Sequence, residues 1–161
     1  MKRLVLLLAA SALAYGVWWL CLRSPERQIE AAQMDFLEAL EGHDWQDVEA
    51  MLAPDFIAVS GHNRGNVMPD LQRALGGFVT LSIETKPVHI QAAKDLGIIS
   101  QTLRLTGLGS TLAIAVRERA NQITTPWLFH WRKTGSWPWN WQLTQVHNDT
   151  PLPATAEFIS P

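Results

Sequence analysis

The sequence predicts an α+β protein in which three helices pack on a strongly curved, mostly antiparallel sheet of about five to six strands. An N-terminal transmembrane helix is expected to precede this domain. After residue 24, apolar residues first recur at three- and four-residue spacing, which is typical of amphipathic helices. From Phe78 onward, long segments rich in β-branched residues alternate between apolar and polar side chains, which is typical of strands. Helices followed by a run of adjacent strands indicate the α+β class.

The N-terminal helix is predicted from Leu4 to Leu22, a run of 19 residues without a charge. A helix of this length spans roughly 28 Å, close to the ~30 Å hydrocarbon core of a bilayer. The pattern favours an uncleaved signal anchor over residues 1–24, with Trp18 and Trp19 near one membrane interface. Two alternatives stay open: a buried core helix, and a cleaved signal peptide whose small-residue site is Ala12-Leu13-Ala14.

Charge suggests where the domain lies and which partners it excludes. Lys2 and Arg3 before the apolar run favour a cytoplasmic N-terminus, so the domain is expected on the extracytoplasmic, periplasmic side. After cleavage it would instead be secreted. Without Lys2, Arg3 and Arg23, the chain has 10 Lys and Arg against 15 Asp and Glu. An acidic domain of this kind is not expected to bind nucleic acid.

The first predicted helix begins at Ser24 and Pro25, a cap residue followed by proline at the first helical position. Gly42 is expected to end this helix. Its apolar stripe consists of Ile29, Ala32, Phe36, Leu37 and Leu40.

Shorter elements are predicted between this helix and the sheet. Asp44 can cap a second helix that Pro54 ends, and residues 56–59 are expected to form a short strand. A polar loop follows over residues 60–66. A third helix is expected over residues 68–75, ended by Gly76 and Gly77.

Five longer segments are predicted strands because apolar and polar residues alternate along them. A turn at residues 134–138 joins the last two, and residues 150–161 are expected to be a coil tail after a domain of residues 25–149. The five segments are 80–91, 97–108, 110–123, 127–133 and 139–147.

This order of elements resembles the nuclear transport factor 2-like superfamily, the cone-shaped α+β barrel shared with SnoaL-like proteins and ketosteroid isomerases. The resemblance covers about residues 26–149. It rests on the element order, on the junction Ala53-Pro54-Asp55-Phe56 and on Trp141 before Gln142-Leu143 in the last strand. The resemblance implies a curved sheet around a helix-lined pocket, and often dimerisation through the open face of the sheet. Fold alone does not determine function, however.

A catalytic mechanism is possible only if the residue types that it needs occur in the sequence. The ketosteroid isomerase mechanism needs a phenol, and the only tyrosine is Tyr15 in the predicted anchor. No nucleophile motif or phosphate loop is present. The five histidines are 17 to 41 residues apart, so no metal site and no cofactor are expected. The side chains from which an acid–base pair could be drawn are Asp35, His62, Arg104 and His147, with His147 expected to face the pocket.

Five tryptophans lie within 15 residues on the last two predicted strands and their turn. Because the two faces of a single sheet do not both become core, some of these rings should face a ligand, a partner subunit or a membrane surface. This set, predicted to bind a ligand or partner, consists of Trp127, Trp131, Trp137, Trp139 and Trp141.

Together these features predict a membrane-anchored domain, leaning toward a non-catalytic one, that binds a small apolar ligand or a protein partner, including a second copy of itself. The membrane contact is expected through residues 4–22. The alternative function is a small-molecule enzyme of SnoaL-like type that uses an acid–base pair in the cone pocket.

Overall fold

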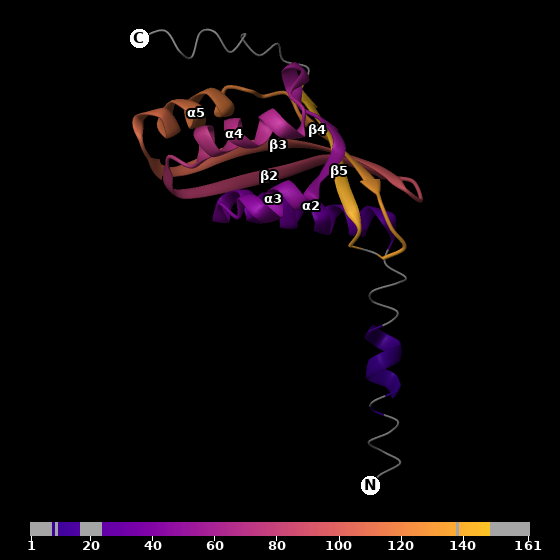
Figure 1. Ribbon diagram of the computed structural model, residues 1–161. Coiled ribbons are helices and arrows are strands. Elements are labelled where there is room, and N and C mark those ends of the chain that lie inside the picture. The colour runs from indigo at the N-terminus through magenta and orange to yellow at the C-terminus, as the bar shows by residue number, and fades with distance from the viewer. Residues whose placement is uncertain (1–7, 9, 17–23, 138, 149–161) are drawn as a thin grey trace.

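The computed structural model describes residues 8, 10–16, 24–137 and 139–148. Five strands form one open sheet in the order β1-β5-β4-β3-β2, in which β1 runs parallel to β5 and the other pairs are antiparallel (Figure 1). The α+β class is therefore confirmed, with five strands. The elements are α2 (Pro25–Gly42), α3 (Trp45–Met51), β1 (Leu52–Ile57), the 3₁₀ helix η1 (Val59–Gly61), α4 (Arg64–Leu75), β2 (Phe78–Ala92), β3 (Leu96–Gly109), α5 (Thr111–Asn121), β4 (Trp127–Lys133) and β5 (Trp141–Asn148).

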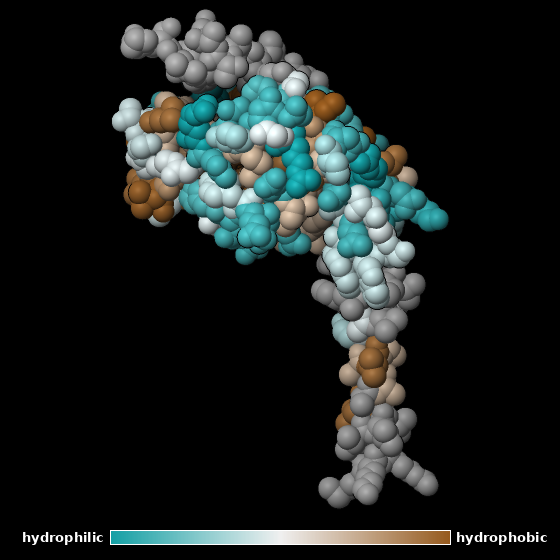
Figure 2. Space-filling view, in the orientation of Figure 1, coloured by the Kyte–Doolittle hydropathy of each residue, from teal (hydrophilic) through white to brown (hydrophobic). Residues whose placement is uncertain are grey.

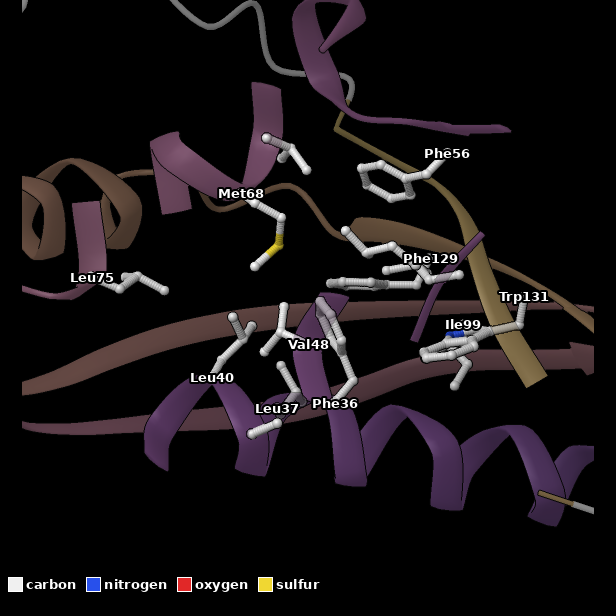
Figure 3. Packing of buried hydrophobic residues seen from close by; sticks show 14 of the residues in the cluster. Phe36, Leu37, Leu40, Val48, Phe56, Met68, Leu75, Ile99, Phe129 and Trp131 are labelled. Carbon is white, nitrogen blue, oxygen red and sulfur yellow. The ribbon is translucent and has the colours of Figure 1, made fainter. Parts of the chain in front are cut away.

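Helix α2 packs against the inner face of the sheet through its predicted apolar stripe. Ile29, Phe36 and Leu40 are buried there. They belong to one core cluster with Ile99 of β3 and buried residues of β4 and β5 (Figure 3). The last helical residue is Gly42, and the cap residue His43 after it takes a left-handed conformation with φ 59°. Gly42 therefore precedes the turn residue and does not form it.

The predicted strand over residues 110–123 is wrong, because this segment forms helix α5. The alternation of β-branched residues there resembles a strand, but Ser110 caps a helix: its Oγ accepts a hydrogen bond from Ala113 N at 3.2 Å. Asn121 then fastens the helix to the sheet, since its side chain both accepts from Leu105 N and donates to Leu105 O at 2.8 Å. The domain thus has one helix more than predicted.

Three other elements begin a few residues away from their predicted starts. Helix α4 begins at Arg64, four residues before the prediction, because the Asn63 side chain accepts hydrogen bonds from the amides of Gly65 and Asn66. Strand β1 begins at Leu52, directly after α3, and not at Phe56. Strand β5 begins at Trp141, which places Trp139 in the turn before it.

The Ala-Pro-Asp-Phe junction lies within β1, and its side chains lie on both faces of the sheet. Ala53 and Phe56 are buried in the core, whereas Asp55 is exposed on the outer face. Both oxygens of Asp55 accept hydrogen bonds from the Arg132 guanidinium on β4, at 2.6 and 2.9 Å. This two-pronged bond with Arg132 lowers the pKa of Asp55 and raises that of Arg132. The motif therefore couples β1 to β4 across β5.

The predicted membrane helix falls only partly within the described residues. Residues 10–16 are helical there, and the rest of the 4–22 run lies almost wholly outside them. Across the described ranges, no helix is both long and apolar enough to cross a bilayer. The predicted anchor over residues 4–22 therefore stays a prediction.

Candidate functional site

An apolar cavity of about 370 Å³ lies between the helices and the sheet. Phe36 and Leu40 of α2 line it from one side. Residues of α4, α5 and the sheet line the rest of it. In Figure 1, α4 and α5 lie on the opposite side of β2 and β3 from α2. Figure 3 shows Leu75 of α4, which lines the cavity, across from Leu37 and Leu40 of α2. Further lining residues are Leu71, Ala74, Val116, Ala120, Trp127, Phe129 and Val146.

Among the described residues that line this cavity, His62 is the only one with a titratable side chain. It follows η1, and its carbonyl oxygen accepts a hydrogen bond from Ala58 N at 2.7 Å, which closes the loop over the cavity. Its Nδ1 lies 3.1 Å from Asp70 Oδ2, and the Asp70 carboxylate also binds Arg73 at 3.2 Å. Because Nδ1 faces this carboxylate, Nε2 is the ring nitrogen left for a ligand. Asp70 belongs to α4 and was not predicted as a site residue.

The four candidate catalytic residues do not converge. Only His62 lines the cavity. Asp35 is exposed on α2, and Arg104 is exposed on the outer face of β3, opposite Glu84 in the register. His147 lies on the outer face of β5. An acid–base set drawn from these four residues is therefore not assembled.

The prediction that His147 faces the pocket is wrong because β5 contains a bulge. Trp131 pairs with Leu143, but the preceding His130 pairs with Gln145, so Thr144 is an extra residue. One inserted residue moves every later side chain to the opposite face. Val146 therefore lines the cavity, whereas His147 turns outward.

His147 instead stacks on His130, which shares the outer face. The ring centroids lie 5.3 Å apart at an interplanar angle of 28°. Burial, together with the charge of His147, lowers the pKa of His130 below its usual value of 6.5. A neutral His130 is thus favoured in the folded protein.

Acid should destabilise the protein through His130. On acidification through pH 6.5, the unfolded chain takes up its proton at this histidine before the folded protein does, so the free energy of unfolding falls as pH falls. We expect urea titrations between pH 8 and 5.5 to show this slope. His130→Gln should flatten it, whereas His89→Gln, at an exposed site on the same sheet, should leave it intact. A steeper or unchanged slope in His130→Gln would contradict this role.

The five tryptophans divide into three groups. Trp131 and Trp141 are buried at 1% and 3% exposure, and their indole N–H groups donate to Gln33 and Gln28 of α2 at 2.9 and 3.2 Å. Trp127 lines the cavity. Trp137 and Trp139 stack on each other, 5.1 Å apart, and stay exposed at 55% and 58%.

Sequence reasoning missed the cavity-lining residues of α4 and α5. Val116 and Ala120 were assigned to a strand, and their three- to four-residue spacing with Ala113 was the available signal. Within the described ranges, no group of three or more His, Cys, Asp or Glu side chains could hold a metal ion. The outer face of the sheet exposes Ile57 and Leu96, and a homodimer through this face stays a prediction.

Comparison with known proteins identifies the fold. No family model matches the chain, and no curated protein sequence matches it. Solved structures match over most of its length. An NTF2-like protein of unknown function from Pseudomonas putida is 15% identical, with a TM-score of 0.57, over 81% of this chain and 89% of that one. An NTF2-like protein of unknown function in nutrient uptake from Rhodospirillum rubrum is 19% identical, with a TM-score of 0.57, over 77% and 98%.

A third match is to part of a larger protein. Bd1075 of Bdellovibrio bacteriovorus is 11% identical with a TM-score of 0.59. The match covers 80% of this chain and 41% of Bd1075, so this chain corresponds to less than half of that protein. These likenesses establish the nuclear transport factor 2-like fold, as the sequence resemblance predicted.

Proposed function

We propose that this chain, which has the nuclear transport factor 2-like fold, binds a small and mostly apolar molecule in its cavity without catalysing a reaction on it. The observation that carries the proposal is a cavity of about 370 Å³ whose lining is apolar except for His62. Ligand sites commonly enclose about 300–1,000 Å³ and combine apolar walls with a few polar groups. The cavity is therefore large enough for a ring system or a short branched hydrocarbon.

His62 determines which polar group the ligand should carry. With Nδ1 directed at Asp70 across 3.1 Å, the neutral ring donates there and keeps Nε2 as a hydrogen-bond acceptor. A ligand hydroxyl can donate to this nitrogen. A ligand without any polar group would leave Nε2 unpaired if the cavity became dry. We therefore expect an apolar molecule with one hydroxyl.

The absence of catalysis is supported by what surrounds His62. Acid–base catalysis usually places a second polar group at the reacting atom, and among the described residues that line the cavity no other titratable group is found. A histidine held by a carboxylate can nevertheless act as a general base. A reaction of the SnoaL-like type that starts with proton removal by His62 is accordingly the second candidate, favoured by the Asp70 contact alone.

A titration with N-phenyl-1-naphthylamine, a neutral apolar probe whose fluorescence rises in apolar surroundings, tests the binding proposal. The full chain in detergent should bind one probe molecule with a dissociation constant in the micromolar range, about −8 kcal/mol. Apolar alcohols should displace it more strongly than the matching hydrocarbons. A signal that rises linearly without saturation, as in micelles alone, would contradict the proposal.

We also propose that the domain works at a membrane surface, as the apolar N-terminal run suggests. Helix α2 begins only three residues after this run, and the apolar helical residues 10–16 are coloured mainly brown and beige in Figure 2. Gln28 in the second turn of α2 accepts hydrogen bonds from Lys133 and Trp141, so the β4–β5 turn lies near the start of α2 (Figure 1). That turn carries the exposed Trp137–Trp139 pair, and tryptophan prefers membrane interfaces.

Spin labels can test this orientation in the full chain. In a Cys21→Ser background, a nitroxide at Ser136→Cys in the β4–β5 turn should collide with oxygen more than with a water-soluble nickel chelate in lipid nanodiscs. A label at Glu118→Cys, on the exposed side of α5, should show the opposite preference. Equal nickel access at both sites would contradict the contact of the turn. Failure of the chain to enter nanodiscs would contradict the anchor itself.

A further inference from the structure

A second hollow lies between α2 and strands β2 and β3, separate from the apolar cavity. Its volume is about 130 Å³, and of the residues described in the structure Leu37 alone lines both spaces. Its wall is apolar at Met34, Leu37, Ile90 and Ile99, and polar at Glu30, Gln33, Thr85 and Gln101. This hollow is separate from the proposed site of the apolar ligand.

Two buried amide groups in this hollow have unpaired donors. Gln33 is 2% exposed and Gln101 is 3% exposed, and neither Nε2 has a hydrogen-bond partner among the described residues. A buried donor without a partner costs about 1–3 kcal/mol. Two such donors in one small hollow therefore indicate that an acceptor occupies it.

The orientation of the Gln33 amide follows from its neighbour. Trp131 Nε1 lies 2.9 Å from the Gln33 oxygen. An indole N–H only donates, so the oxygen of Gln33 has to face Trp131 and its NH₂ group has to face away. Exchanging the oxygen and nitrogen of this amide would leave the buried Trp131 N–H opposite another donor. Gln33 therefore presents a donor to the hollow.

The charges around the hollow limit the class of ligand that can bind there. The described residues that line it include no Lys, Arg or His, and the exposed Glu30 carboxylate is part of the lining. An anion would have no countercharge here and would be repelled by Glu30. A neutral carbonyl oxygen can accept from the two glutamines, while an N–H of the same ligand can donate to Glu30. The apolar wall residues suit small alkyl groups.

We infer that this hollow binds a small neutral carboxamide, held by Gln33 and Gln101 through its carbonyl oxygen. This site lies beyond the proposed function, and its ligand is chemically unlike the apolar molecule expected in the main cavity. A volume of about 130 Å³ admits an amide of a few heavy atoms or several water molecules. Water is thus the occupant that an experiment has to distinguish.

N-methylacetamide is the probe, with acetate as the anionic counterpart of similar size. In nitrogen-15 spectra of the labelled full chain in micelles, the side-chain NH₂ signals of Gln33 and Gln101 should shift saturably with N-methylacetamide, at a dissociation constant of about 1–10 mM. Acetate should leave them in place. Gln101→Met should weaken binding about tenfold and keep the Trp131–Gln33 bond. Gln91→Met, at an exposed position of β2, should change nothing.

Two results would overturn the inference. Unmoved glutamine signals at 100 mM N-methylacetamide would mean that water alone occupies the hollow. Equal shifts with acetate would reject the neutral ligand class. Both results are read from the unmodified chain, so they stand even if Gln101→Met fails to fold. Saturation of the apolar cavity with N-phenyl-1-naphthylamine should leave these glutamine signals unchanged.

Discussion

Replacing Ala74 with tryptophan should weaken binding of N-phenyl-1-naphthylamine at least about 100-fold. Ala74 lies on α4 and lines the cavity, so an indole ring there would occupy much of the 370 Å³. A hundredfold loss corresponds to about 2.7 kcal/mol, which excluding the aromatic probe from its site readily supplies. A fluorescence titration measures the change.

The free energy of unfolding of Ala74→Trp provides a second measurement, which does not depend on the probe. Overpacking a filled core costs about 1–3 kcal/mol, whereas filling an existing cavity should leave the free energy of unfolding unchanged or raise it. Ala115→Trp provides the matched control, since Ala115 is exposed on α5 and outside the cavity lining. Wild-type binding by Ala74→Trp would mean that the probe binds elsewhere.

Replacing Trp131 with alanine should lower the free energy of unfolding by about 3–5 kcal/mol, the largest stability loss expected of any single tryptophan here. Trp131 is 1% exposed and meets the edge of Phe36, with ring centroids 6.2 Å apart. The substitution removes this packing and leaves the buried oxygen of Gln33 without its donor. Urea unfolding followed by circular dichroism measures the loss.

Two further variants separate the contribution of the indole hydrogen bond from that of the buried ring. Trp131→Phe keeps an aromatic ring but deletes the indole N–H, so it should cost less than Trp131→Ala. Trp137→Ala removes a ring that is 55% exposed and should change stability by no more than about 0.5 kcal/mol. If Trp131→Ala lowered the free energy of unfolding as little as Trp137→Ala, the packing of β4 against α2 described above would be incorrect.

The exposed and buried tryptophans show the limit of sequence reasoning at this sheet. Period-two alternation along β4 places Trp127 and Trp131 on the face opposite His130, because it follows directly from strand geometry. It did not show which rings would be covered. The covering residues, Gln33 and Phe36, lie about 100 positions earlier in the chain. Only the packing of α2 brings them to the sheet.

The error at α5 has a different cause. Thr111, Ile114 and Val116 have high strand propensity, which predicts a strand when the segment is considered alone. The side-chain contacts made by Ser110 and Asn121 and the burial of Ala113 select the helix. Tertiary contacts thus outweighed a local preference of at most about 1 kcal/mol per residue. As a consequence, one wall of the cavity was absent from the predicted site.

The sequence by itself determined the fold class, the start of α2 with its apolar stripe, the inner face of β4 and the apolar character of residues 4–22. These features depend on spacing within one segment, where helical and strand geometry leave few choices. Only the tertiary structure decided that His62 rather than His147 reaches the cavity, and that Gln33 and Gln101 share a second hollow. The inserted residue in β5 turns His147 away from the cavity, and the packing of α2 on β3 brings Gln33 and Gln101 to one hollow, because pairing and packing join segments that lie far apart in the sequence.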